Sequence, residues 1–160
     1  MQSESGKIQY HKDPLQITWH SVRQAVGHIA NRLAAHNYKP QRILAVARGG
    51  MIPAVMLSHI LDVREVGSVQ VEAYDGRIKG AATKVITGFG QVEHYNKPDT
   101  LIVDDLWDTG ETHEHLRRLF HQATFATLFY KDRGDESHRI VSFPGLAVPR
   151  DEWLQFPWEA

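Results

Sequence analysis

The sequence predicts an α/β fold, in which one open, mostly parallel, twisted sheet is flanked by helices. Its 160 residues fit a single unit, since domains commonly contain about 100 to 200 residues. Hydrophobic residues make up 42% of the chain, which is enough to build a core. Short apolar runs alternate with segments in which apolar residues recur at helical spacing. We therefore expect one domain over residues 1–160.

Composition limits the classes of function. The chain has no cysteine and therefore forms no disulfide. Lys and Arg number 18, Asp and Glu number 19, and the net charge of -1 gives no general attraction to nucleic acid or anionic membranes. Residues 1–14 lack the apolar core of a secretory signal, and no later run approaches the roughly 18 apolar residues of a membrane span. We expect a cytoplasmic protein with no nucleic-acid partner and no integral membrane association.

The first elements expected are a short strand over 15–19 and an amphipathic helix after it. The helical spacing is carried by Val22, Val26, Ile29 and Leu33. Thr18 or Ser21 is suited to cap this helix, and Asn37 and Pro40 are suited to end it.

A strand over 43–46, a tight Ala-Arg-Gly-Gly turn and a buried helix over 51–61 come next, and a further strand is expected over 66–74. Residues 75–98 are rich in glycine and polar side chains and offer little to bury, apart from a possible hairpin at 85–87. A loop of this length is usually either a lid or a disordered insertion, and both interpretations stay open.

The second half predicts a strand over 100–103, a helix, and strands over 125–130 and 140–148. The apolar face of that helix is formed by Leu116, Leu119 and Phe120. Three histidines lie near each other in this part of the chain, namely His113, His115 and His121. Because side chains two positions apart diverge by about 200° around a helix, His113 and His115 cannot hold one metal ion from the same face. We expect these histidines on a solvated helix surface.

Residues 101–112 (LIVDDLWDTGET) carry the strongest indication of chemistry. An apolar strand leads into adjacent Asp104 and Asp105, and a Thr-Gly-Glu-Thr turn then opens a helix. In an open α/β sheet, ligands bind beyond the carboxyl ends of the strands, where this turn falls. Its amides and threonine hydroxyls can surround a phosphate at the positive end of the helix, and Gly110 permits a close approach.

The acidic pair must serve another part of the ligand, because carboxylates repel a phosphate. Asp104 and Asp105 can accept hydrogen bonds from two neighbouring hydroxyls, or hold Mg2+ through water. A phosphorylated sugar presents both features. The alternative is that the pair merely ends a strand and the turn merely caps a helix, as Asp and Thr commonly do.

In order and spacing, several segments resemble the type I phosphoribosyltransferases, which use 5-phosphoribosyl 1-diphosphate (PRPP). Residues 101–112 are similar to the PRPP motif of that family, and 47–50 are similar to its pyrophosphate loop. Residues 129–131 and 151–159 resemble the base-binding end of the bacterial xanthine-guanine enzymes and their hypoxanthine-using relatives. The resemblance implies the type I fold, with a flexible lid over 75–98 and a small base-binding hood over 140–160.

The resemblance also implies a reaction in purine salvage. A 6-oxopurine (guanine, xanthine or hypoxanthine) displaces pyrophosphate from C1 of PRPP, with Mg2+ as cofactor, and gives a purine nucleoside 5'-monophosphate. Charge develops on the ribose and on the departing pyrophosphate. Asp104 and Asp105 would hold the ribose hydroxyls, and Asp105 would also position Mg2+. Asp108 would contact the imidazole side of the purine and assist its deprotonation.

By the same resemblance, two turns would hold the anionic groups. The 5'-phosphate would be cradled by Asp108, Thr109, Gly110, Glu111 and Thr112. Pyrophosphate would be received by Arg48, Gly49 and Gly50, for which an ordinary strand-to-helix turn is the alternative. Glu111 stands where many relatives carry glycine, so its carboxylate must point away from the phosphate. Tyr74 would close over pyrophosphate from the lid, although Ala73 stands where relatives often have serine.

The base would be read by residues near the end of the chain. The Lys131 ammonium could donate to the 6-oxo group and so reject a 6-amino group, the alternative being a lysine that faces solvent. Trp153 would stack on the base, and the Leu154 backbone would contact the edge that carries the 2-substituent. For Trp153 the alternative is ordinary packing.

A rival function of a different class is a catalytically inactive regulator on the same fold that senses PRPP or a nucleotide, because fold alone does not separate the two. Asp108, Lys131 and Trp153 favour an enzyme, since a sensor of PRPP needs no base pocket. An enzyme for orotate or adenine is a third interpretation. The resemblance further implies a homo-oligomer, either a dimer or a tetramer.

Overall fold

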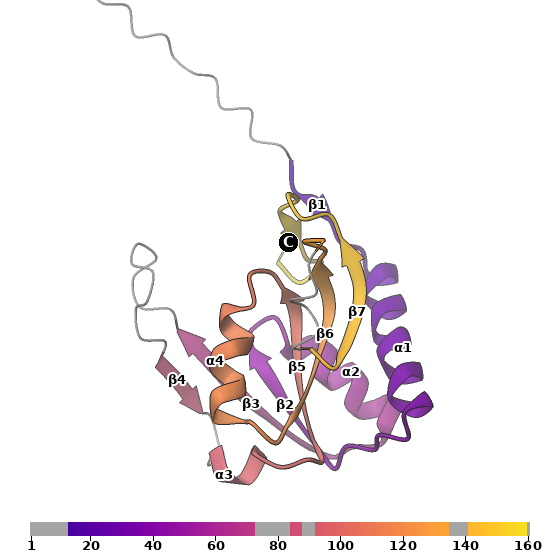
Figure 1. The fold of residues 1–160 in the computed structure, drawn as a ribbon. Coiled ribbons are helices and arrows are strands. Elements are labelled where there is room, and N and C mark those ends of the chain that lie inside the picture. Colours follow the sequence, from indigo (N-terminus) through magenta and orange to yellow (C-terminus); the bar gives the residue numbers. More distant parts are fainter. Residues whose placement is uncertain (1–12, 73–83, 88–91, 135–140, 160) are drawn as a thin grey trace, which may run out of the picture.

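The computed structural model describes residues 13–72, 84–87, 92–134 and 141–159 (Figure 1). Its main sheet has six strands in the order β4-β3-β2-β5-β6-β7. They are β2 (Arg42–Ala47), β3 (Glu65–Glu72), β4 (Lys84–Thr87), β5 (Thr100–Trp107), β6 (Thr124–Lys131) and β7 (Phe143–Val148). Every neighbouring pair is parallel except β3 with β4, which is antiparallel. The predicted α/β fold with a mostly parallel sheet is confirmed.

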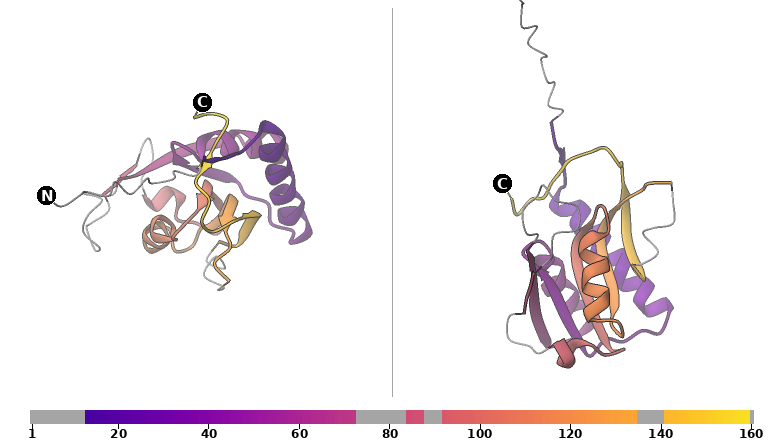
Figure 2. Two further views of the ribbon diagram at one scale, coloured as in Figure 1. Left: turned by 90° about the horizontal axis from the view of Figure 1, so that it is seen from above. Right: turned by 60° about the vertical axis from the view of Figure 1, so that its left-hand side comes forward.

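Helices cover both faces of this sheet, which explains why its central strands are continuous apolar runs. Helices α1 (Trp19–Ala35) and α2 (Met51–Leu61) pack on one face and share one hydrophobic cluster with it (Figure 2). Helices α3 (Val92–Tyr95) and α4 (Glu111–Leu119) contribute to a second cluster on the other face. No helix in the described part of the chain combines the length and apolar character needed to cross a bilayer.

Helix α1 begins where the sequence predicts. The Ser21 backbone N–H donates to Oγ1 of Thr18, the N-cap residue, over 3.1 Å. The buried face of the helix consists of Val22, Ala25, Val26, Ile29 and Leu33. Asn37, just beyond the end of the helix, has a left-handed φ of 51°, a conformation that asparagine tolerates better than most residues. Local sequence signals therefore set both ends of α1.

A second, two-stranded sheet joins the two ends of the described chain. Strand β1 (Leu15–Gln16) pairs in parallel with β8 (Leu154–Gln155), and the Leu15 N–H donates to the Trp153 carbonyl over 2.7 Å. Phe156, just after β8, packs against Phe129 of β6 with ring centroids 5.9 Å apart. The hood expected over 140–160 is therefore divided in the structure, since β7 belongs to the main sheet and the residues after it form the smaller part.

Two strand boundaries differ from the prediction. The strand expected over 100–103 continues to Trp107, so the acidic pair lies within β5 and not after it. Apolar patterning ends at Val103, but the strand is extended by pairing with β6 through Trp107. The strand expected over 15–19 is only two residues long, and Trp19 already belongs to α1.

The segment 75–98, expected to be a loop with little to bury, contains regular structure. Its described parts include β4, which matches the possible hairpin at 85–87, and the short helix α3. Tyr95 of α3 is only 5% exposed and belongs to the core on the α4 side of the sheet. Residues 75–83 and 88–91 lie outside the described residues.

Candidate active site

The predicted site residues gather at one edge of the sheet. The carboxyl ends of β2, β5 and β6 lie side by side there, close to the β1–β8 sheet (Figure 1). Arg48, Gly49 and Gly50 follow β2, the turn 108–112 follows β5, and Lys131 ends β6. This is the edge at which open α/β sheets bind ligands.

The acidic pair differs in burial because successive side chains on a strand point to opposite faces. Asp104 is 8% exposed and faces the α4 side, where Oδ2 lies 3.6 Å from Nε2 of His113. Its other oxygen, Oδ1, accepts a hydrogen bond of 2.9 Å from the Asp105 backbone N–H. Asp105 is half-buried and faces the turn after β2. The two carboxyl groups therefore border the same edge from different faces of β5.

Burial raises the pKa of Asp104 well above its ordinary value, and the neighbouring Asp105 charge raises it further. Burial also raises the pKa of Asp105. Both carboxylates are therefore less well solvated than they would be in water. Ligand hydroxyls would donate hydrogen bonds to these carboxylates, and a cation would neutralise part of their charge.

The turn after β2 lies directly against Asp105. A Cβ atom at Gly49 would overlap the Asp105 carboxyl group, and a Cβ atom at Gly50 would overlap the Val103 carbonyl oxygen. Only glycine allows this approach of the two segments. Gly50 is also the N-cap of α2, and Arg48 before it is exposed. The predicted pyrophosphate turn and the acidic pair are therefore adjacent.

The turn 108–112 also depends on a glycine. Gly110 has a φ of 88°, and a Cβ atom there would lie 2.8 Å from Cζ2 of the buried Trp107 ring. It is the N-cap of α4 and has no side chain to satisfy the first backbone amides of that helix. The Glu111 N–H donates to Oγ1 of Thr109 over 3.4 Å, while the side chain of Glu111 is exposed. Thr112, in the first turn of α4, is half-buried.

Asp108 is held between two cations. Its Oδ2 lies 3.2 Å from Nζ of Lys131, and its Oδ1 lies 3.4 Å from Nη2 of Arg133. The Asp108 carbonyl also accepts a hydrogen bond of 3.0 Å from Nε of Arg133. Lys131 is 8% exposed, which contradicts the alternative of a lysine that faces solvent. Sequence reasoning does not identify Arg133, which lies two residues beyond the end of β6.

At the predicted base-binding end, Trp153 and Leu154 are neighbours with different environments. The Trp153 side chain is 76% exposed, so its ring faces are open to a ligand and do not form ordinary core packing. Leu154 is 6% exposed and belongs to β8. The lid residue Tyr74 lies outside the described residues.

His113 does not lie on a solvated surface, and this expectation was wrong. The residue is 2% exposed and packs near Phe125 of β6, with ring centroids 6.2 Å apart. His113 is on the inner face of α4 because it stands three positions before buried Leu116. Burial lowers its pKa to about 4.

The donor set fits Mg2+ bound together with a phosphorylated substrate. In the described part of the chain, no three His, Asp or Glu side chains group around one metal position. Mg2+ commonly takes one or two protein carboxylates, with substrate phosphates and water as its other ligands. Asp105, half-buried beside the Gly49 turn, can supply such an oxygen.

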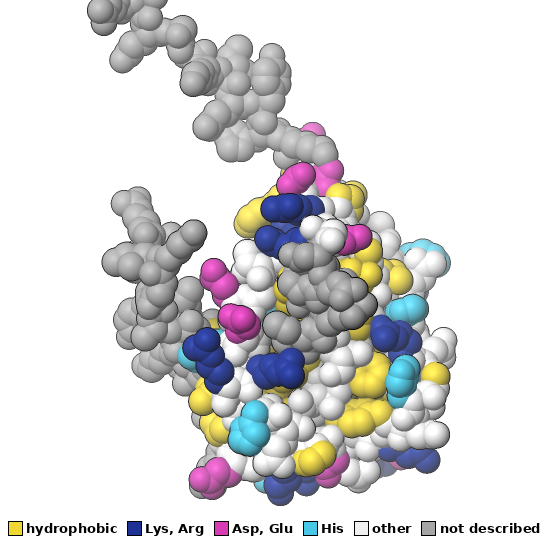
Figure 3. Space-filling model, in the orientation of Figure 1, with side chains coloured by type: hydrophobic (Ala, Val, Ile, Leu, Met, Phe, Trp, Pro, Cys, Tyr) yellow, Lys and Arg dark blue, Asp and Glu magenta, His cyan; other side chains and the backbone are white. Residues whose placement is uncertain are grey.

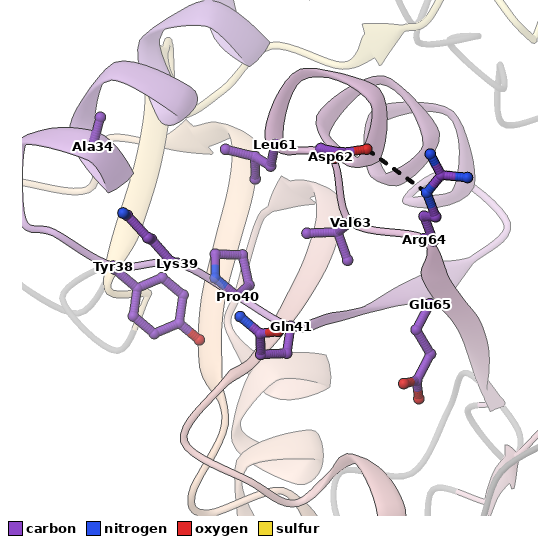
Figure 4. Close-up of a pocket in the computed structure, with 10 residues that line it drawn as sticks. All are labelled: Ala34, Tyr38, Lys39, Pro40, Gln41, Leu61, Asp62, Val63, Arg64 and Glu65. Atoms are coloured by element: carbon purple, nitrogen blue, oxygen red, sulfur yellow. Dashed lines mark ion pairs between the residues drawn. The ribbon is translucent and has the colours of Figure 1, made fainter.

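Other surface features lie elsewhere. A pocket of 590 Å³ lies at the opposite end of the sheet, beside the amino ends of β2 and β3, and contains none of the predicted site residues (Figure 4). On the face shown in Figure 3, acidic and basic side chains are interspersed, with no large area of one sign.

Comparison with known proteins agrees with this geometry. Residues 17–156 match the family model described as the phosphoribosyl transferase domain. The xanthine-guanine phosphoribosyltransferase of Idiomarina loihiensis is 34% identical over 144 residues, which cover 89% of this chain and 85% of that protein. The enzyme of the same name from Desulfotalea psychrophila is 31% identical over 150 residues, or 93% and 88% of the two chains.

A solved phosphoribosyltransferase structure is also similar to this chain. The purine phosphoribosyltransferase from Pyrococcus horikoshii Ot3 superposes with a TM-score of 0.70 at 32% identity, covering 93% of this chain and 95% of that one. The chain belongs to the phosphoribosyltransferase family. The resemblance that the motifs carry is therefore confirmed.

Proposed function

We propose that this protein transfers the 5-phosphoribosyl group of PRPP to a 6-oxopurine, namely guanine, xanthine or hypoxanthine, with release of pyrophosphate and a nucleoside 5'-monophosphate. The observation that carries the proposal is that one glycine-containing turn lies against Asp105 and a second follows the strand that carries Asp104 and Asp105. One turn suits pyrophosphate and the other a 5'-phosphate, while the carboxylates between them suit ribose hydroxyls. This order of groups corresponds to PRPP from one end to the other.

Acidic side chains contact the ribose, whereas a basic side chain and backbone amides contact its leaving group. Asp104 and Asp105 accept hydrogen bonds from the sugar hydroxyls, and their negative charge favours the positive character that develops at C1. Arg48 and the amides near Gly49 and Gly50 receive the departing pyrophosphate. Asp105 and the substrate's own oxygens would hold Mg2+, which would neutralise part of the charge on that leaving group.

The base is held by the cluster around Asp108. One Asp108 oxygen takes the proton from the imidazole side of the purine as the new bond to C1 forms. Lys131 can retain its contact with Asp108 while it donates another of its three hydrogens to the 6-oxo group. Trp153 stacks on the base, and the Leu154 backbone reads the edge with the 2-substituent. A 6-amino group cannot accept a hydrogen bond from Lys131, so adenine is disfavoured.

A pyrophosphate-release assay tests this function. Purified protein is incubated with PRPP, Mg2+ and each base separately, and PRPP binding is measured in parallel by calorimetry. We expect turnover with one or more of guanine, xanthine and hypoxanthine, and little with adenine or orotate. PRPP binding without turnover on any 6-oxopurine would instead favour a sensor protein.

Asp108→Asn tests the role of the base-facing carboxylate. We expect kcat to fall by about 100-fold, because general acid–base groups contribute about 10²- to 10⁴-fold, while PRPP affinity changes less than about threefold. Asp62→Asn is the matched control, since Asp62 is exposed at the end of α2 and its left-handed conformation suits asparagine. Equal losses of kcat and PRPP affinity in Asp108→Asn would contradict the proposed role.

We also infer that the protein forms a homo-oligomer, either a dimer or a tetramer. Helix α2 supports this inference because Met51, Val55 and Ile60 on its outer side are 46%, 50% and 56% exposed although the helix also packs in the core. The cytoplasmic location expected from composition stays a prediction, and cell fractionation with an antibody would test it.

A further inference from the structure

His113 is a buried polar residue that the proposed reaction does not use. It lies in the first turn of α4, immediately behind the 5'-phosphate turn, and its side chain is directed into the core. Among the described residues, Nε2 of His113 has no hydrogen-bond partner. The same atom lies 3.6 Å from Oδ2 of Asp104. An unpaired buried polar atom destabilises the fold, and this carboxylate oxygen is close enough to become its hydrogen-bond partner after a small movement.

The two groups are chemically matched. Because burial lowers the pKa of His113 to about 4, its ring is neutral at pH 7 and carries one N–H. Asp104 accepts a hydrogen bond from the Asp105 amide at Oδ1, and its other oxygen, Oδ2, is the one that lies near Nε2 of His113. Closing the distance from 3.6 Å to a typical hydrogen-bond length of about 2.9 Å requires a movement of only about 0.7 Å.

We propose that His113 is a positioning residue, whose neutral imidazole donates a hydrogen bond from Nε2 to Oδ2 of Asp104 and thereby orients this carboxyl group toward the ribose hydroxyls. With this bond in place, each Asp104 oxygen has one fixed protein donor, the Asp105 amide or the imidazole. Each oxygen retains a second lone pair for the sugar. The inference rests on the proposed function, because it assigns the sugar to Asp104.

A structural role alone does not explain this arrangement. An apolar side chain would pack against Phe125 equally well and would leave no unpaired nitrogen in the core. Trp107 Nε1 is another buried donor without a partner among the described residues, but it packs close to Gly110. His113 is therefore the side chain positioned to serve Asp104.

Steady-state kinetics and PRPP calorimetry on three variants test the proposal. His113→Phe keeps an aromatic ring beside Phe125 and removes the donor, so we expect PRPP affinity to fall about tenfold, as for loss of a hydrogen bond to a charged group. The KM for the purine should change less than about twofold. His113→Gln restores an N–H donor and should recover most of the affinity. Leu116→Ala, one turn further along α4, controls for lost stability and should keep normal PRPP affinity.

Any of three results from PRPP calorimetry would overturn the proposal. The first is a His113→Phe variant that binds PRPP as tightly as the wild type. The second is an equal loss of affinity in His113→Gln, and the third is an equal loss in Leu116→Ala at the same drop in Tm, because either would mean that packing and not the donor matters. If the wild type neither binds PRPP nor turns over, the proposed function fails, and the measurement below still decides whether His113 contacts Asp104.

Nitrogen NMR of histidine-labelled protein provides a readout that does not depend on activity. The chain has ten histidines, so the His113 signals are assigned by their absence in His113→Phe. We expect the neutral tautomer with the proton on Nε2, and a shift of that nitrogen in Asp104→Asn. A proton on Nδ1, or signals that do not respond to Asp104→Asn, would show that the hydrogen bond does not form.

Discussion

Burial acts on two neighbouring residues of the site in opposite ways, because it disfavours the charged form of each. It lowers the pKa of His113 to about 4 and raises the pKa of Asp104. Protonation of His113 therefore favours the unfolded chain, whereas protonation of Asp104 favours the folded one. The protein interior around these two residues therefore favours the uncharged form of each side chain.

This difference gives a prediction on acid stability. The unfolded His113 titrates near 6.5 and the folded one near 4, so its contribution to the free energy of unfolding is complete above pH 6.5 and is lost as the pH falls toward 4. Between pH 7 and pH 4.5, we expect the wild type to lose about 2 kcal/mol more than His113→Phe. Urea denaturation at the two pH values measures this. Identical losses in both proteins would contradict the prediction.

Among the elements, the helix that carries the proposed 5'-phosphate turn begins on a conformation that only glycine adopts without strain. Gly110 has a φ of 88° and lies against the ring of buried Trp107. The Trp107 side chain therefore restricts the position of the turn. Gly134 has a similar φ of 68°, but a Cβ atom there would meet nothing within 4 Å. The two glycines thus separate the effect of backbone strain from the effect of contact.

We expect Gly110→Ala and Gly134→Ala to have different effects on ligand binding. Strain of alanine at positive φ should lower the free energy of unfolding by about 1 kcal/mol in each, and Gly110→Ala should lose more because its Cβ meets the buried Trp107 ring. Only Gly110→Ala should also displace Trp107 and weaken PRPP binding, by about tenfold or more, since the amides of the turn then move. Urea denaturation and PRPP calorimetry measure the two effects. Equal PRPP affinity in the two variants would contradict the account of the turn.

At the scale of the whole molecule, the outer side of the helix after the proposed pyrophosphate turn supports the inferred assembly. Helix α2 packs in the core through Ala54 and Leu57, yet Val55 and Ile60 on its other side are exposed. A helix that is apolar on all sides is usually covered on all sides. A second copy of the chain would cover this surface.

Light scattering after size-exclusion chromatography tests this arrangement. We expect the wild type to elute as a dimer or tetramer, and Val55→Glu with Ile60→Glu to elute as a smaller species, because buried unpaired carboxylates are costly. Gln24→Glu, on the exposed side of α1, adds a charge away from α2 and should leave the assembly intact. A monomeric wild type, or an unchanged double variant, would contradict the inference.

Much of this architecture can be predicted from the sequence, because local patterns determine it. The α2 boundaries follow from an apolar run between Gly50 and Asp62, and the start of α1 follows from Thr18. The site turns can be located because glycine and acidic residues follow apolar strands. Such signals act over a few neighbouring residues and need no knowledge of the remainder of the chain.

The features that sequence reasoning misses depend on tertiary packing. Strand β5 continues past Val103 because β6 pairs with it, and Tyr95 is buried because α3 returns to the sheet. His113 carried a usable signal, since it stands three and seven positions before Leu116 and Phe120, which are also buried. The expectation of a solvated surface was based on the polar type of the residue and did not use this spacing.

The pairing of β1 with β8 affects the order in which parts of the molecule become structured during folding. Gln16 and Gln155 are neighbours across this pair although 139 positions separate them in the chain. Contacts between such distant segments form late, since the chain between them must first be ordered. We therefore expect the β1–β8 sheet, and with it the segment proposed to contact the base, to become ordered after the main sheet has formed.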